Sequence, residues 1–173
     1  AVAFSAALDT REQVNFHRSA SLWQPFIAKA MRDNLLRRFS RQIRQKLDEV
    51  QMKKVMRAST LVELDKELFV PYHNFDSLDD YYLKMGAMTD GYDGRISQVA
   101  IPLLCVQSLD DPVGYHRTFH DPKKVSQAGS GNTMLLFTRT GGHVGWALGT
   151  RPSKEGWSWM SSVAASFAES VDH

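Results

Sequence analysis

Two short apolar segments place the tightest limit on what this chain can fold into. Residues 101–106 read Ile-Pro-Leu-Leu-Cys-Val and residues 134–138 read Met-Leu-Leu-Phe-Thr, and neither alternates apolar with polar positions. Continuous apolar runs of this length are typical of parallel strands that helices cover on both faces. Segments of helical length separate and follow the two runs. The pattern therefore predicts the α/β class, with a parallel sheet.

The rest of the chain divides into one further strand and several helical segments. Residues 2–8 predict a buried strand that ends at a helix cap formed by Asp9 and Thr10. Residues 11–68 contain no glycine and a single proline, Pro25, which predicts a block of two to four helices without a strand. We expect residues 69–75 to form a loop.

The second half of the chain carries clear helix signals. Ser77 and Asp80 have the spacing of a capping box in front of an aromatic helix. One or two short helices fit residues 112–128, and residues 129–132 predict a turn. A final amphipathic helix contains Trp159 and Phe167.

Composition excludes several classes of protein. A length of 173 residues suits one domain, and a formal net charge of +2 argues against a dedicated nucleic-acid binder. No apolar stretch approaches the roughly 18 residues that span a bilayer. The apolar start lacks a preceding basic region, so we read it as the middle of a longer polypeptide rather than a signal peptide. These features predict a cytoplasmic or membrane-associated protein, with no obligate protein partner evident.

The single cysteine, Cys105, lies within the first apolar run. A lone cysteine forbids an internal disulfide, and its position predicts a small buried strand residue rather than a catalytic thiol.

Three polar residues follow the two strands and point to catalysis. Asp110 and Asp111 come directly after the first apolar run, and His143 lies on a glycine-rich loop just after the second. Ligands of open α/β sheets bind at the carboxyl ends of the strands, so these side chains are expected to meet. A carboxylate that binds one imidazole nitrogen prepares the other to remove a serine proton. Two simpler interpretations remain open: the aspartate caps the helix after Pro112, and the histidine is an ordinary surface residue.

From residue 75 onward the sequence resembles the C-terminal part of an α/β-hydrolase. More narrowly it is similar to the YheT-type bacterial carboxylesterases and the α/β-hydrolase-domain lipases of animals and plants. The pieces that carry the resemblance are Phe75-Asp76, Asp80-Tyr81-Tyr82, Ile101-Pro102, Asp110-Asp111-Pro112 and Gly141-Gly142-His143-Val144-Gly145-Trp146. The resemblance is looser before residue 75.

The resemblance implies a partial α/β-hydrolase domain with defined segments. Residues 1–10 correspond to a core strand, residues 11–75 to the helical cap region, and residues 76–173 to the C-terminal core. The family's acid maps onto Asp111, with Asp110 as the alternative, and its histidine maps onto His143. The implied activity is serine-dependent hydrolysis of carboxylic or lipid esters, without a cofactor or metal.

The sequence contains no Gly-x-Ser-x-Gly elbow to carry a nucleophilic serine. We therefore expect the longer polypeptide to be active and this chain alone to be catalytically silent. Two alternatives stay open. The chain is a non-catalytic interaction or ligand-binding module, or it is an acyltransferase, for which the spacing of His116 and Asp121 is a weak signal.

Residues 32–57 hold nine Lys or Arg residues against three acidic ones. Such a helical segment can meet lipid headgroups, so a membrane surface is a candidate partner. The simpler interpretation is the solvated outer face of a helix.

Overall fold

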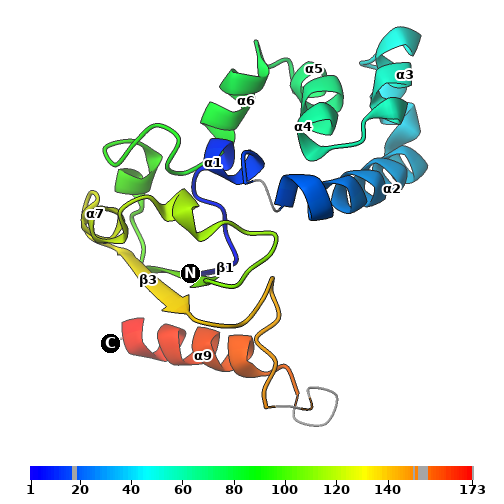
Figure 1. Cartoon of the computed structure of the whole chain (residues 1–173). Helices are drawn as coiled ribbons and strands as arrows, with labels where there is room; N and C mark the ends of the chain where they lie inside the picture. Colours follow the sequence, from blue (N-terminus) through cyan, green and yellow to red (C-terminus); the bar gives the residue numbers. More distant parts are fainter. Residues whose placement is uncertain (17–18, 150, 152–155, 173) are drawn as a thin grey trace. The chain divides into compact units, whose positions relative to one another are not determined.

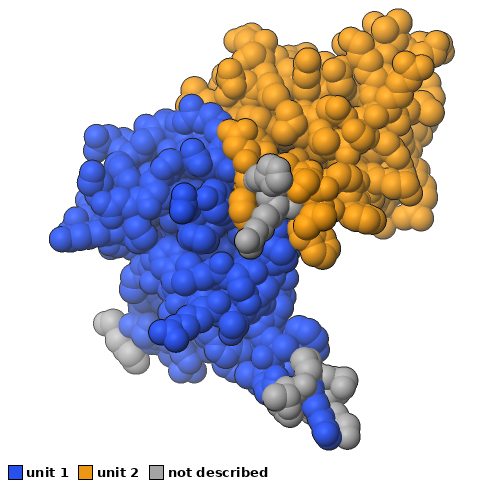
Figure 2. Space-filling view, viewed as in Figure 1, with its two compact units in different colours: residues 1–13, 86–173 blue, residues 14–85 orange. Residues whose placement is uncertain are grey.

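The computed structural model describes residues 1–16, 19–149, 151 and 156–172 and divides the chain into two compact units. Residues 1–13 and 86–173 form unit 1, and residues 14–85 form unit 2 (Figure 2). Unit 1 contains the sheet, and every regular element described in residues 14–85 is helical (Figure 1).

Unit 1 is built on a parallel sheet in the order β1-β2-β3. Its strands are β1 (Val2–Phe4), β2 (Leu103–Ser108) and β3 (Thr133–Thr138). The partners of β2 in register are Val2 to Phe4 on one side and Thr133 to Thr138 on the other. The expected parallel α/β architecture is thus confirmed, and it is consistent with a partial α/β-hydrolase fold.

Helices lie against both faces of this sheet. On one face Leu104 and Val106 pack with Trp146 and with Phe167 of α9 (Trp159–Val171). On the other face Cys105 packs in a cluster with residues of three short helices. These helices are η3 (Arg95–Gln98), η4 (His116–Phe119) and α7 (Pro122–Gln127). Burial on both sides explains why β2 needs apolar residues at successive positions.

Cys105 lies in the middle of β2 and is 1% exposed. Burial raises the pKa of its thiol to about 11. The side chain is therefore a neutral packing residue at physiological pH, as its position in the sequence predicts.

Strand β1 is shorter than the sequence indicates. It ends at Phe4 because Ser5 has a φ of 50°, which leaves the extended region. Leu8 is nonetheless buried, and its carbonyl accepts the backbone N–H of Met88 at 2.8 Å. Asp9 then caps α1 (Thr10–Val14), where its carboxylate accepts the backbone N–H of Arg11 at 2.9 Å.

Unit 2 consists of helical segments of 4 to 21 residues around a core of its own. They are η1 (Ser19–Trp23), α2 (Gln24–Arg44), α3 (Glu49–Arg57), α4 (Leu61–Leu64), η2 (Asp65–Phe69), α5 (Val70–His73) and α6 (Leu78–Met85). The buried core residues of this unit are Ile43, Leu47, Met52, Val55, Ala58, Leu64 and Leu68. The helical character predicted for residues 11–68 is confirmed over the part that the structure describes. The expected number of two to four helices is wrong, because the segment is divided into α1, η1, α2, α3, α4 and η2. None of the described helices is both long enough and apolar enough to cross a membrane.

The loop expected at residues 69–75 is wrong, because most of this segment is helical. Helix η2 extends to Phe69 and α5 follows it directly. Pro71 lies in the first turn of α5, directly after the wider turns of η2. The helix ends at Asn74, which adopts the left-handed conformation with a φ of 58°.

The predicted capping box of α6 forms only in part. Ser77 Oγ accepts the backbone N–H of Asp80 at 3.0 Å, as expected. The carboxylate of Asp80 instead accepts the N–H of Asp76 and pairs with Lys84 one turn further on.

Unit 2 contains a carboxyl group with an unusual environment. The hydroxyl of Tyr82 donates to Asp65 Oδ2 at 2.9 Å, and burial raises the pKa of Asp65 to about 6. A folded-state pKa above the unfolded value means that protonated Asp65 favours the folded state. This contribution is complete below the ordinary pKa of about 4 and is lost as the pH rises through 6.

We predict that Asp65→Asn removes this pH dependence, because asparagine keeps an acceptor for Tyr82 but cannot ionise. The free energy of unfolding of the wild type, relative to that of the variant, should fall between pH 4 and pH 6. Urea titrations of both proteins across this range measure the difference. Parallel pH profiles for the two proteins would contradict the prediction.

Candidate active site

The pairing of β2 with β3 brings the carboxylates and the histidine loop to one edge of the sheet. Ser108 is in register with Thr138, and the N–H of Leu109 continues the ladder by donating to the Thr138 carbonyl at 2.8 Å. Both strands run in the same direction, so the segments that follow them leave the sheet at the same edge. The 109–111 turn and the 139–146 loop therefore begin side by side.

Asp111 is held in place by hydrogen bonds to both of its carboxylate oxygens. Oδ1 accepts the backbone N–H groups of Val113 at 2.8 Å and Gly114 at 2.7 Å. Oδ2 accepts from Nε2 of Gln107 at 3.2 Å and lies 3.0 Å from Nδ1 of His143. The side chain of Asp111 has no exposed surface. These bonds fix the orientation of the carboxylate.

The ionisation of Asp111 reflects two opposing influences. Burial on its own would raise the pKa of Asp111. The hydrogen bonds from His143 and from the backbone N–H groups of Gly114 and Val113 outweigh burial and hold the pKa below its ordinary value. Asp111 is therefore a buried carboxylate at neutral pH.

His143 has one nitrogen engaged and one available. Nδ1 faces Asp111, while Nε2 has no hydrogen-bond partner among the residues that the structure describes. The side chain is 39% exposed. Since a carboxylate accepts a hydrogen bond from Nδ1–H, the neutral imidazole is favoured in the form that leaves Nε2 unprotonated. That form can act as a general base.

The loop that carries His143 is anchored by the glycines and by Trp146. The backbone N–H of Trp146 donates to the Gly141 carbonyl at 2.9 Å, and its indole N–H donates to Thr138 Oγ1 at 2.9 Å. The indole stacks on Trp159 with ring centroids 5.4 Å apart. Gly141 lies so close to this indole that a Cβ there would overlap it. The loop thus returns to the end of β3.

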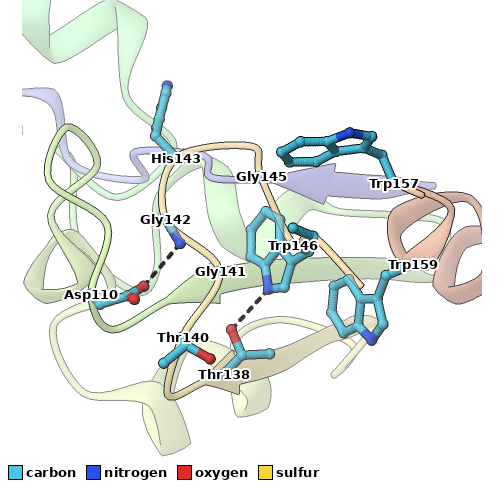
Figure 3. A pocket seen from close by; sticks show the side chains of 11 residues that line it. Asp110, Thr138, Thr140, Gly141, Gly142, His143, Gly145, Trp146, Trp157 and Trp159 are labelled. Atoms are coloured by element: carbon cyan, nitrogen blue, oxygen red, sulfur yellow. Dashed lines mark hydrogen bonds between the residues drawn. The ribbon is translucent and has the colours of Figure 1, made fainter. Parts of the chain in front are cut away.

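Asp110 does not contact His143. Its Oδ1 accepts the hydroxyl of Ser108 and the backbone N–H of Gly142, the latter at 2.9 Å (Figure 3). The hydrogen bonds from Ser108 and Gly142 lower the pKa of Asp110. Of the two aspartates that the sequence offers as the acid, the geometry therefore pairs Asp111 with the histidine.

A cavity of about 600 Å³ lies beside the histidine loop. Figure 3 shows three indoles along it, those of Trp146, Trp157 and Trp159, together with the backbone of the two glycines before His143. Sequence reasoning did not single out Trp157, and no motif surrounds it that would have done so. Among the described residues, no three His, Cys, Asp or Glu side chains gather closely enough to hold a metal ion.

Unit 1 contains a second acid–histidine pair that sequence reasoning missed. His120 Nε2 lies 2.9 Å from Asp9 Oδ2, and the two side chains are 37% and 5% exposed. The residues are 111 positions apart, and no shared motif links them. The other oxygen of Asp9 caps α1, as described above.

The residues behind the acyltransferase alternative have local roles in the structure. The Asp121 carboxylate accepts the backbone N–H of Lys123 at 3.0 Å and so caps α7. His116 packs edge-on against the neighbouring ring of Tyr115.

Several known proteins are similar in sequence to this chain. Human "Monoacylglycerol lipase ABHD2" is 24% identical over 127 residues, which are 73% of this chain and 28% of that protein. Zebrafish ABHD2 is 26% identical over 126 residues, and human "Phospholipase ABHD3" is 30% identical over 127 residues, 72% of this chain. The match spans 28% of the length of each of these relatives. No family model and no solved structure matches the chain.

The glycine loop offers a direct test of this geometry. We predict that Gly141→Ala lowers the free energy of unfolding by about 3 kcal/mol, since the new methyl group overlaps the Trp146 indole and the backbone has a φ of 156°. Gly142→Ala is the matched control, because its Cβ would meet open space. Its cost should be about 1 kcal/mol, which comes from a φ of 59°. Urea unfolding followed by tryptophan fluorescence measures both, and equal effects would contradict the packing of the loop.

Proposed function

Because the chain belongs to the α/β-hydrolase superfamily, we propose that it supplies the acid and the base of a Ser-Asp-His triad. In this proposal Asp111 is the acid and His143 is the base. The whole protein is a serine-dependent hydrolase of carboxylic esters, and its substrates are lipid esters. Known relatives of the chain are named as a monoacylglycerol lipase and a phospholipase, which supports a lipid ester hydrolase.

The observation that carries the proposal is the contact between Asp111 and His143. A buried carboxylate with a lowered pKa lies 3.0 Å from Nδ1 of a half-exposed imidazole. The acid and the base come from adjacent parallel strands, at the edge where such sheets bind their ligands. An acid that merely capped a helix would not need the imidazole.

The proton path follows from this arrangement. Nε2 of His143 takes the hydroxyl proton of the serine while the serine oxygen bonds to the ester carbonyl carbon. Asp111 stays ionised and stabilises the imidazolium through Nδ1–H. The imidazolium then gives the proton to the departing alcohol as the ester bond breaks. A water molecule then attacks the acyl-enzyme with the same help from His143, which releases the carboxylic acid product and regenerates the serine.

We propose that the nucleophilic serine lies outside these 173 residues. The sequence contains no Gly-x-Ser-x-Gly elbow, and the aligned region is 28% of the length of human ABHD2. We also propose that residues 1–10 form a core strand, residues 11–75 a cap and residues 76–173 the C-terminal core of the hydrolase domain. The helical character of unit 2 supports a cap.

The names of the relatives suggest the class of substrate. One set of relatives is named for monoacylglycerol and the other for phospholipids. Both substrates present a carboxylic ester next to an acyl chain, so we propose an acylglycerol or phospholipid ester as substrate.

We predict that His143→Ala and Asp111→Asn inactivate the natural protein that carries this sequence. His143→Ala removes the base and should lower kcat by about 10⁶-fold. Asp111→Asn favours the wrong imidazole tautomer and should lower kcat by about 10⁴-fold. Hydrolysis of a p-nitrophenyl ester measures turnover. A fluorophosphonate probe should label the wild type on a serine and should not label the 173-residue chain by itself.

The second acid–histidine pair provides a matched control. His120→Ala removes an imidazole of similar exposure that contacts a buried aspartate at a similar distance. Its turnover should remain within about twofold of the wild type, since His120 has no place in the proposed triad. Full activity of His143→Ala, or labelling of the 173-residue chain by the probe, would contradict the proposal.

A further inference from the structure

The backbone on both sides of His143 is bound by side chains from neighbouring strands. The N–H of Gly142, the residue before it, donates to Asp110 Oδ1 at 2.9 Å. The N–H of Val144, the residue after it, donates to Ser5 Oγ at 3.2 Å. Asp110 follows β2 and Ser5 follows β1. The histidine therefore lies between two attachment points on two strands.

The loop needs such attachment because its own backbone is strained. Gly142 has a φ of 59° and Val144 a φ of 54°, so left-handed residues flank His143 on both sides. A β-branched residue in this region is a genuine outlier that persists only where the surroundings impose it. The hydrogen bond from the Val144 N–H to Ser5 Oγ helps to hold Val144 in this conformation.

The attachment through Asp110 is itself rigid. Its Oδ1 also accepts the hydroxyl of Ser108, which is completely buried at the end of β2. The carboxylate is therefore oriented by the strand from which it comes. A charged acceptor strengthens the bond to the Gly142 N–H, although the Asp110 side chain is exposed.

The attachment through Ser5 is fixed in the same way. The backbone N–H of Ser5 donates to the Val106 carbonyl at 2.9 Å, which holds it to the middle strand. Ser5 has a φ of 50°, a conformation that costs a non-glycine residue about 1–2 kcal/mol. Its left-handed backbone ends β1, and its hydroxyl lies within reach of the histidine loop.

We propose that Asp110 and Ser5 are positioning residues that hold His143 in register with Asp111 by binding the N–H groups on either side of it. The proposal rests on the catalytic role proposed above for His143. Neither residue donates or accepts a proton in the reaction. Their effect is geometric, because a displacement of the base by about 1 Å can cost 10²-fold in rate.

The test compares variants of the natural protein in ester hydrolysis. Asp110→Ala should lower kcat by about 10- to 100-fold and leave KM within about twofold. Asp110→Asn keeps an oxygen acceptor for the Gly142 N–H and should restore kcat to within about threefold of the wild type. If Asp110→Asn lowers kcat as much as Asp110→Ala does, the hydrogen bond to the Gly142 N–H does not determine turnover and the proposal fails.

Ser5 requires a pair of variants that separates its hydroxyl from its backbone. Ser5→Ala keeps the strain and Ser5→Gly relieves it, while both remove the acceptor for Val144. Both should lower kcat by about 10-fold at unchanged KM. Normal turnover in Ser5→Gly, or fluorophosphonate labelling of Ser5 itself, would overturn the assignment of Ser5 as a positioning residue.

Two controls distinguish the failure of this proposal from the failure of the proposed function. Asp121→Ala removes another carboxylate that accepts a backbone N–H, but at helix α7, and should leave kcat unchanged. If His143→Ala is inactive while Asp110→Ala and Ser5→Ala are fully active, only the positioning proposal is wrong. If His143→Ala is active, the proposed function is wrong.

Discussion

The register between β2 and β3 is the constraint on which the rest of unit 1 depends. Ser108 pairs with Thr138, so the turn with Asp111 and the loop with His143 start from matched positions. A slip of one residue would also turn every side chain of β3 to the opposite face of the sheet. The two apolar clusters on the faces therefore fix the register, and the register brings the acid to the imidazole.

The elements that could be predicted from the sequence are those whose pattern follows directly from burial. The apolar runs of β2 and β3 predicted two-sided strands, and the glycines around His143 predicted a tight loop beyond the sheet. The contact between Asp111 and His143 followed from the rule that parallel strands end at one edge. The family resemblance favoured Asp111 over Asp110 as the acid, but only the hydrogen bonds from Val113 and Gly114 show which carboxylate turns inward.

The features that escaped prediction depend on contacts between distant residues or on backbone conformation. Ser5 ends its strand through a left-handed φ that nothing in its local sequence indicates. Pro71 suggested a loop, although the first turn of a helix accepts proline equally well. The pair of Asp9 and His120 joins residues 111 positions apart, so no local pattern could reveal it.

A single measurement decides whether Asp111 keeps the proton of His143 on Nδ1 and leaves Nε2 free to accept one. Nitrogen-15 NMR of the histidine ring distinguishes the two neutral tautomers. At a pH where the ring is neutral, we predict that His143 carries its proton on Nδ1 and that Asp111→Ala abolishes this preference. A proton on Nε2 in the wild type, or a tautomer unchanged by Asp111→Ala, would contradict it.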